Sequence, residues 1–189
     1  MIHQSTVQQC KPPQLRVGII TALSSYDMEH LCEATELAIQ DGIGFNWMTV
    51  PVRDTLESYW NGVIVMPQRI LFGAWLDGVL CGAVQLVQQP KSHETKFFSA
   101  SIDAHFIAPW ARGHGLASQL LEIAEYEAAK RGVNVIRLSV RDTQEQAIKL
   151  YRENKYVEWG VLPHYEMVGG EMISGHYFYK TLEPLSSLE

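Results

Sequence analysis

The chain has 189 residues, of which 47% are hydrophobic and 19% charged, and 15 Lys and Arg against 21 Asp and Glu give it a formal charge of −6. This balance is typical of a folded globular protein, and it argues against extended disorder and against nucleic acid as a partner. No apolar run reaches the roughly 20 residues that cross a bilayer, and the polar N-terminus lacks the apolar core of a signal peptide. We therefore expect a cytoplasmic protein with no membrane or nucleic-acid partner.

Hydrophobic periodicity and turn residues divide the chain into a polar leader over 1–14, one domain over 15–182 and a short tail over 183–189 whose end resembles an expression scar. The mixed order of strands and helices predicts a mixed α/β sheet. In chain order we expect strand Leu15–Ile20, helix 25–42, helix 52–62, strands Arg69–Leu76 and Val79–Gln88, strand 97–108, a helix that opens after 109–115 and reaches 131, strand 133–140, helix 143–154, and strands 157–162 and 172–180 around a loop at 163–171.

The most informative segment runs from Arg112 to Ala117 and connects a predicted strand to a long predicted helix. A helix that begins there directs unpaired N–H groups and the positive end of its dipole at one place. The small residues Gly113 and Gly115 allow a ligand to approach the main chain, which suits a pyrophosphate. A Gly-x-Gly alone more often only shapes a turn.

The residues around this turn have a recognisable spacing. Arg112, Gly115 and Ala117 fit Arg/Gln-x-x-Gly-x-Gly/Ala, and the segment from Gln144 to Tyr151 reads Gln-x-x-Ala-x-x-Leu-Tyr. A dinucleotide fingerprint and a P-loop do not fit, because the third glycine and a Gly-Lys-Ser/Thr are lacking. The two signatures resemble those of the GNAT superfamily of N-acetyltransferases, over about 15–182. Shorter segments are similar to its tabtoxin-resistance-type branch: 44–45, 59–60, 85–86, 111–116, 160–163 and 177–182.

The resemblance implies an acyl-CoA N-acyltransferase fold, with a mixed, mostly antiparallel sheet that is splayed between its fourth and fifth strands and flanked by helices. It also implies acetyl-CoA as cosubstrate, no metal, and direct transfer of the acetyl group to an amine. The residues that it assigns to the cofactor are Phe106 and Ile107 beside the pantetheine arm, the main chain of Arg112, Gly113, His114, Gly115, Leu116 and Ala117 at the pyrophosphate, and Gln144, which replaces the usual Asn.

For catalysis we expect Tyr151 to protonate the leaving thiolate, because it stands at the family's tyrosine position and a phenol suits general-acid work. The alternative is that Tyr151 only packs in the core. At the position where many relatives carry an Asp or Glu base, this chain has Ser139. Asp103 is our candidate base and His105 the second choice, because both alternate onto one face of the predicted strand 97–108.

For the acceptor we expect Trp60, His164, Tyr165 and Glu166 to line a pocket for a small amine-bearing molecule, such as a toxin, an antibiotic or an amino-acid-like compound. A carboxylate such as Glu166 equally fits a polyamine or an aminoglycoside. The rival hypothesis is a non-catalytic acyl-CoA sensor or regulatory domain, which Ser139 and Gln144 favour and Tyr151 disfavours. The chain is expected to be a monomer or a homodimer.

Overall fold

The computed structural model describes residues 11–42, 45–90 and 92–183. Most of the predicted leader, the end of the tail and Gly44 lie outside these residues. The elements are β1 (Leu15–Ile20), α1 (Ser25–Gln40), α2 (Arg53–Val65), β2 (Arg69–Leu76), β3 (Val79–Gln88), β4 (Ser99–Ile107), a 3₁₀ turn η1 (Pro109–Ala111), α3 (Leu116–Lys130), β5 (Val135–Arg141), α4 (Glu145–Glu153), β6 (Val157–Val168) and β7 (Glu171–Thr181).

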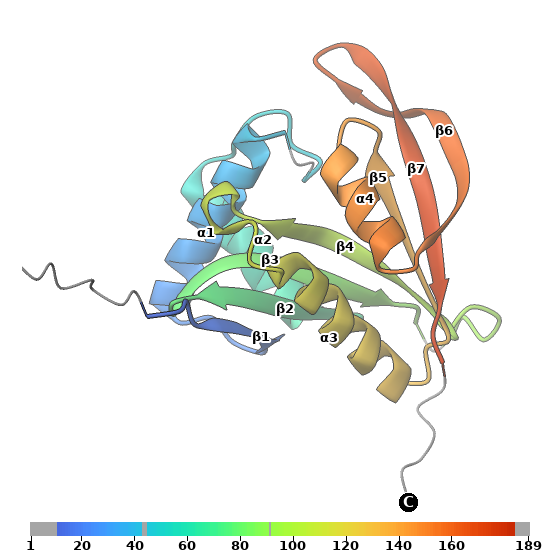
Figure 1. The fold of residues 1–189 in the computed structure, drawn as a ribbon, viewed down its shortest axis with the longest axis horizontal. Helices are drawn as coiled ribbons and strands as arrows, with labels where there is room; N and C mark the ends of the chain where they lie inside the picture. Colours follow the sequence, from blue (N-terminus) through green and yellow to red (C-terminus); the bar gives the residue numbers. More distant parts are fainter. Residues whose placement is uncertain (1–10, 43–44, 91, 184–189) are drawn as a thin grey trace, which may run out of the picture.

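The strands form one sheet in the order β1-β2-β3-β4-β5-β7-β6 (Figure 1). Every described pairing is antiparallel except that of β4 with β5. These two parallel strands pair only from Ser99 opposite Val135 to Ser101 opposite Arg137, although β4 continues to Ile107 and β5 to Arg141. The strands therefore diverge, which confirms the predicted mixed sheet with a split between its fourth and fifth strands.

Helices cover both faces of the sheet (Figure 1). Side chains of α3 and α4, such as Leu120 and Ile148, pack with β2 to β5 in one apolar core. Side chains of α1 and α2, such as Leu31 and Leu56, pack with β2, β3 and β4 in a second core on the other face. Among the described residues, no helix is long and apolar enough to cross a membrane.

The region after α4 differs from the expectation. The segment 163–171 was predicted as a loop, but β6 continues through it to Val168 and turns at Gly169 and Gly170. Pro163 does not end the strand because β6 lies at the edge of the sheet, where a missing N–H costs no ladder bond. Its register shifts between Leu162 and Glu166, so the strand bends without ending.

Candidate active site

The first wall of the site is the turn between η1 and α3. Gly113 and Gly115 have φ of 84° and 76°, a left-handed conformation that glycine adopts without strain. Gly115 is the N-cap of α3, and no side chain caps this end of the helix. The first N–H groups of a helix have no partner within it, so this turn presents donors and the positive end of the dipole to an anion.

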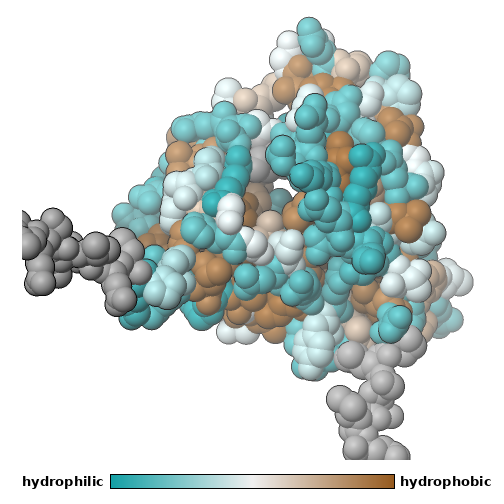
Figure 2. Space-filling view, in the orientation of Figure 1, coloured by the Kyte–Doolittle hydropathy of each residue, from teal (hydrophilic) through white to brown (hydrophobic). Residues whose placement is uncertain are grey.

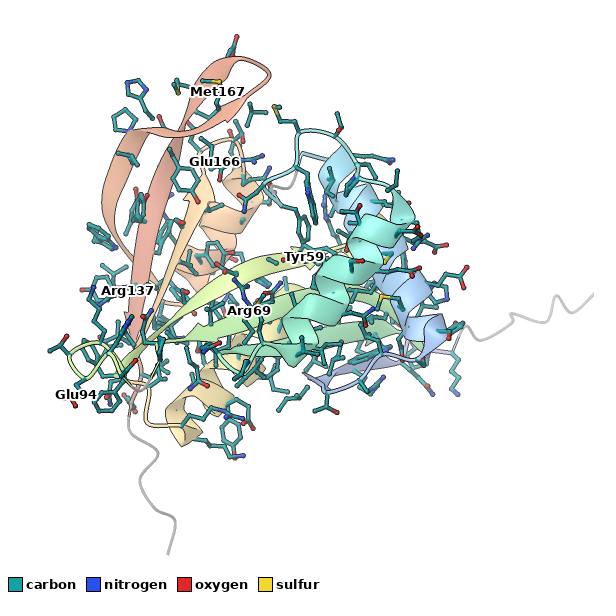
Figure 3. The ribbon with its side chains drawn as sticks, turned by 180° about the vertical axis from the view of Figure 1, so that it is seen from behind. Tyr59, Arg69, Glu94, Arg137, Glu166 and Met167 are labelled. Carbon is teal, nitrogen blue, oxygen red and sulfur yellow. The ribbon has the colours of Figure 1, made fainter. Side chains whose placement is uncertain are left out.

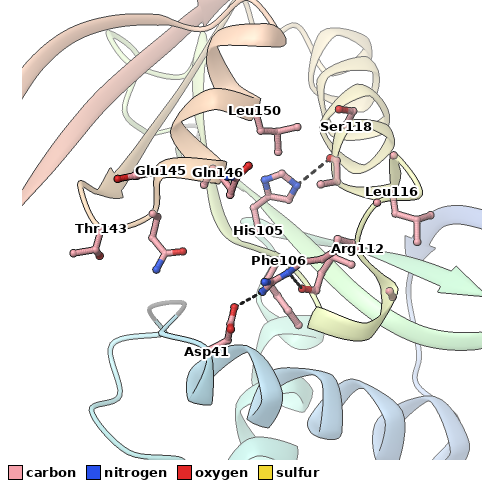
Figure 4. Close-up of a pocket in the computed structure, with 17 residues that line it drawn as sticks. Asp41, His105, Phe106, Arg112, Leu116, Ser118, Thr143, Glu145, Gln146 and Leu150 are labelled. Atoms are coloured by element: carbon pink, nitrogen blue, oxygen red, sulfur yellow. Dashed lines mark hydrogen bonds and ion pairs between the residues drawn. The ribbon is translucent and has the colours of Figure 1, made fainter.

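These donors open onto a cavity of about 590 Å³ between α3 and α4. In Figure 2 the surface is hollowed between the part of the molecule that carries α1 and the part that carries α4, and Figure 4 shows the side chains that line this hollow. The edge of β4 beyond Ser101 is not paired with β5, so its main chain is open to an extended ligand. An uncapped helix end and a free strand edge suit a long molecule with an anionic group.

The structure brings most of the predicted cofactor residues together around this cavity, which we call the cofactor cleft. His114 does not line it: its side chain is exposed, so any cofactor contact would come from its main chain. The predicted residues that do line it are Phe106, Ile107, Arg112, Gly113, Gly115, Leu116, Ala117 and Gln144.

Two contacts tie the end of α1 to this cleft, and sequence reasoning missed both. Arg112 forms an ion pair of 2.7 Å with Asp41, which also lines the cleft (Figure 4). The amide of Gln144 donates a hydrogen bond of 2.8 Å to the carbonyl of Gly42. No motif signals these partners, because more than 70 residues separate each pair in the sequence. An acidic side chain therefore lies beside the proposed anion site.

His105 lines the inner end of the cleft, and Tyr151, which does not line it, contacts His105 from behind. The hydroxyl oxygen of Tyr151 lies 3.2 Å from Nδ1 of His105. On the other side of the ring, Nε2 of His105 lies 3.0 Å from the carbonyl oxygen of Ala117, the contact drawn as a dashed line in Figure 4. A carbonyl only accepts, so Nε2 carries the proton and donates it to Ala117. In the neutral imidazole Nδ1 is then an acceptor, and the hydroxyl of Tyr151 is the donor to it.

Burial keeps both groups uncharged at neutral pH. Burial lowers the pKa of His105 to about 4, although the hydrogen bond to Ala117 opposes this shift. Burial also raises the pKa of Tyr151 well above its usual value, and neighbouring Tyr165 adds to the shift. His105 is therefore a weak base and an orienting group, and Tyr151 keeps its proton until a stronger acceptor takes it.

The expectation that Asp103 and His105 share one face of a strand is wrong. Phe106 pairs with Ala83 and Asp103 with Gln85, so two residues of β4, at positions 104 and 105, lie opposite one residue of β3. This β-bulge, with Ala104 at φ 45°, reverses the alternation of side chains. His105 contacts α3, whereas Asp103 forms an ion pair of 3.4 Å with Arg69.

A second cavity of about 350 Å³ lies next to the cofactor cleft, and we call it the acceptor cavity. The two cavities share His105, Gln144 and Ala147, so they meet beside Tyr151. The residues that line the acceptor cavity are Phe45, Asn46, Tyr59, Arg69, Ile102, Asp103, Ala104, His105, Ser139, Val140, Arg141, Gln144, Ala147, Tyr151, Tyr165 and Glu166.

Two of the four predicted acceptor residues line this cavity and two do not. Tyr165 shares a hydrogen bond of 2.9 Å with Ser139, and Glu166 is paired with Arg141. Trp60 was a wrong prediction: it is fully buried in the α1–α2 core, where its indole N–H donates to Thr35.

His164 was also wrongly predicted as a residue of this cavity, because its side chain is exposed on β6 and does not line it. Adjacent Tyr59 lies on the cavity side of α2 instead of Trp60, since one step along a helix turns a side chain by about 100°. Arg69 and Arg141 line the cavity and were missed, since neither belongs to a motif. Within the ranges that the structure describes, no three His, Cys, Asp or Glu side chains are grouped to hold a metal ion.

Comparison with known proteins agrees with this geometry. Residues 29–156 match the model of the "Acetyltransferase (GNAT) family". An uncharacterized N-acetyltransferase from the hisH-hisA intergenic region of Azospirillum brasilense is 43% identical over 127 residues, which are 67% of this chain and 76% of that protein.

Solved structures share the fold at low identity. An N-acetyltransferase from Staphylococcus aureus Mu50 superposes with a TM-score of 0.73 at 16% identity, over 92% of this chain and 100% of that one. YncA from Salmonella typhimurium, solved with its cofactor acetyl-CoA, superposes with a TM-score of 0.71 at 13% identity, over 93% and 98% of the two chains. The chain belongs to the GNAT family of N-acetyltransferases, for which acetyl-CoA is the acetyl donor.

Proposed function

We propose that this N-acetyltransferase moves an acetyl group from acetyl-CoA directly to the amine of a small molecule, such as a toxin, an antibiotic or an amino-acid-like compound. One observation carries the proposal: the cofactor cleft and the acceptor cavity meet at His105, Gln144 and Ala147, beside the hydroxyl of Tyr151. A volume of about 350 Å³ suits a small acceptor.

In this proposal the cofactor cleft binds acetyl-CoA mainly through the main chain. The N–H groups of the turn from Gly113 to Ala117 hold the pyrophosphate, and the free edge of β4 holds the pantetheine arm. The bound cofactor supplies a thioester carbonyl that an amine can attack. Binding energy from the remote nucleotide thus positions the reacting end beside the acceptor cavity.

The acceptor amine must lose a proton before it attacks. An alkyl ammonium with a pKa near 10.4 is only about a thousandth deprotonated at pH 7.4, which costs roughly 4 kcal/mol. Asp103 lines the acceptor cavity with a half-exposed carboxylate and serves as the base, directly or through a water. His105 has no free nitrogen for this role, because Nε2 donates to the carbonyl of Ala117 and Nδ1 accepts from the hydroxyl of Tyr151.

Tyr151 gives a proton to the leaving sulfur. Before the reaction its O–H donates to His105, which is itself held by Ala117, so the phenolic oxygen is fixed in place and the O–H turns from His105 to the sulfur as the thiolate forms. A buried phenolate is costly, as the raised pKa of Tyr151 indicates. Tyr151 therefore takes up a proton from the acceptor side as it gives its own to the sulfur, and it stays neutral over the whole cycle.

The test is release of free thiol from acetyl-CoA in the presence of a panel of small amines, with the product identified by its added acetyl mass. We expect turnover with at least one amine class and none without an amine. Calorimetric binding of acetyl-CoA with no thiol release on any amine would support the acyl-CoA sensor instead and overturn this proposal.

A further inference from the structure

A polar network lies beneath the acceptor cavity, and the transfer chemistry above does not use it. Its centre is Gln85 on β3, which is fully buried. Nη1 of Arg69 donates to the side-chain oxygen of Gln85, and the Gln85 amide donates a hydrogen bond of 2.8 Å to the hydroxyl oxygen of Tyr59. Arg69 and Tyr59 both line the cavity, so one buried amide positions two polar groups that face it.

The donor and acceptor roles in this network follow from the chemistry of arginine. A guanidinium only donates, so the oxygen of Gln85 must face Arg69 and its NH₂ group must face Tyr59. The hydroxyl of Tyr59 is then an acceptor toward Gln85 and keeps its own proton, because burial raises its pKa. Tyr59 can direct that O–H into the cavity.

The acceptor cavity is lined by two arginines and two carboxylates, so their charges cancel. The Nε–Nη2 edge of Arg141 is occupied, because both nitrogens contact one carboxylate oxygen of Glu166 at 2.5 Å. Arg69 is more open: its contact with Asp103 is longer, at 3.4 Å. In the described part of the chain, both side-chain contacts of Arg69 are made by Nη1, so its Nε and Nη2 donors are left for another partner.

Figure 3 shows where these groups lie. Tyr59 and Arg69 come from α2 and β2, and Glu166 comes from β6 on the other side of the opening. With two arginines and two carboxylates, the cavity has no net charge to attract a polycation. A second ammonium group of a polyamine would meet a guanidinium, whereas a carboxylate would find a planar donor fork and a phenolic O–H.

We propose that the acceptor is zwitterionic, a small amino acid or amino-acid-like molecule, and that Arg69 and Tyr59 bind its carboxylate while Asp103 receives its ammonium group. This inference rests on the proposed function, because it concerns the acceptor of the same transfer. Gln85 acts as a positioning residue that fixes Arg69 and Tyr59.

The experiment compares matched acceptors: free amino acids, their methyl esters, their decarboxylated amines, and spermidine. For the wild-type chain we expect kcat/KM for the free acids to exceed that for the esters about tenfold to hundredfold, the usual effect of one charged hydrogen-bonding partner. In Arg69→Gln this preference should collapse, because the free acids should lose much more kcat/KM than the esters. Arg69→Lys, which keeps the charge but loses the fork, should retain part of it.

The matched control is Arg137→Gln, which removes one positive charge from an exposed position on β5 outside the cavity (Figure 3). It should keep the full preference for free acids. Acetyl-CoA affinity, measured by calorimetry, must be unchanged in every variant, which shows that each has folded.

Two results would overturn the inference while leaving the proposed function standing: esters, amines or spermidine acetylated as well as the free acids, or an equal loss for all acceptors in Arg69→Gln. Binding of acetyl-CoA without turnover on any acceptor would instead overturn the proposed function itself.

Discussion

The two cavities at the split in the sheet differ in the groups that line them. In the cofactor cleft, one turn contributes main-chain groups and small residues beside side chains from α1, β4 and α4 and one ion pair, whereas the acceptor cavity is lined by side chains from several elements, with two ion pairs among them. A protein with a formal charge of −6 can bind an anion in this way, because helix N–H groups supply the local positive potential. In our proposal, main-chain donors bind the constant cofactor, and side-chain charges select the variable acceptor.

The largest expected effect is at the junction of the two cavities. Tyr151→Phe removes the proposed proton donor and should lower kcat about a hundredfold or more. The Kd for acetyl-CoA should change by less than about twofold, since Tyr151 does not line the cofactor cleft. Thiol release and calorimetry measure the two quantities separately.

The control for this variant is Tyr156→Phe. Tyr156 is buried and its ring packs 5.8 Å from that of Tyr151, but its hydroxyl has no hydrogen-bond partner among the described residues. This variant should keep its turnover. Full turnover by Tyr151→Phe, under conditions where chemistry limits the rate, would contradict the role of Tyr151.

The second effect tests whether the junction is uncharged. The unfolded chain protonates His105 near pH 6.5, while the folded chain does so only near pH 4, so between these values the unfolded state binds more protons. The free energy of unfolding should therefore fall as the pH is lowered through this window, by about 3 kcal/mol for this one group.

Urea unfolding of the wild type and His105→Gln at a series of pH values isolates this contribution. Other acid-sensitive groups cancel in the difference, including Glu158, whose pKa is lowered by hydrogen bonds from Arg152 and His176. The free energy of unfolding of the wild type minus that of His105→Gln should fall as the pH is lowered from 6.5 to 4. Parallel curves would show that His105 is not buried in its neutral form.

A smaller effect tests the main-chain character of the cofactor cleft. Gly115→Val places a branched side chain at φ 76°, which costs about 1–2 kcal/mol and displaces the first N–H groups of α3. We expect the Kd for acetyl-CoA to rise at least about tenfold. Gly78→Val is the matched control, because Gly78 has φ 86° in the β2–β3 turn, away from both cavities.

Gly78→Val should lose stability in thermal unfolding and yet bind acetyl-CoA normally. Equal losses of affinity in the two variants would mean that strain, and not the N–H groups of the turn, accounts for the effect.

The smallest effect concerns the acidic residue at the cofactor cleft. Asp41→Asn releases Arg112 and removes a negative charge beside the proposed pyrophosphate site. Both side chains are almost half exposed, so we expect acetyl-CoA affinity to increase only about two- to fivefold at low salt, and the gain to vanish at high salt. Titrations at two ionic strengths measure this, with exposed Glu29→Gln on α1 as the charge control. A loss of affinity would show that Asp41 holds Arg112 in its binding position.

The sequence by itself determined the features that depend on neighbours along the chain. The strands and helices were predicted to within a few residues, except that β6 continues past Pro163. The turn from Arg112 to Ala117 and the helix after it are contiguous, so their spacing alone located the helix end to which we assign the anion of the cofactor.

Only the tertiary structure decided which side chains meet at the acceptor cavity. Arg69, Asp103, Arg141 and Glu166 come from four different strands, and their pairing follows from the order and register of the sheet. The β-bulge at Ala104 turned His105 away from Asp103 toward Tyr151, and no local pattern marked it. The physical reason is that periodicity fixes the direction of a side chain relative to its own strand or helix, while a cavity is defined by the elements that pack across from it.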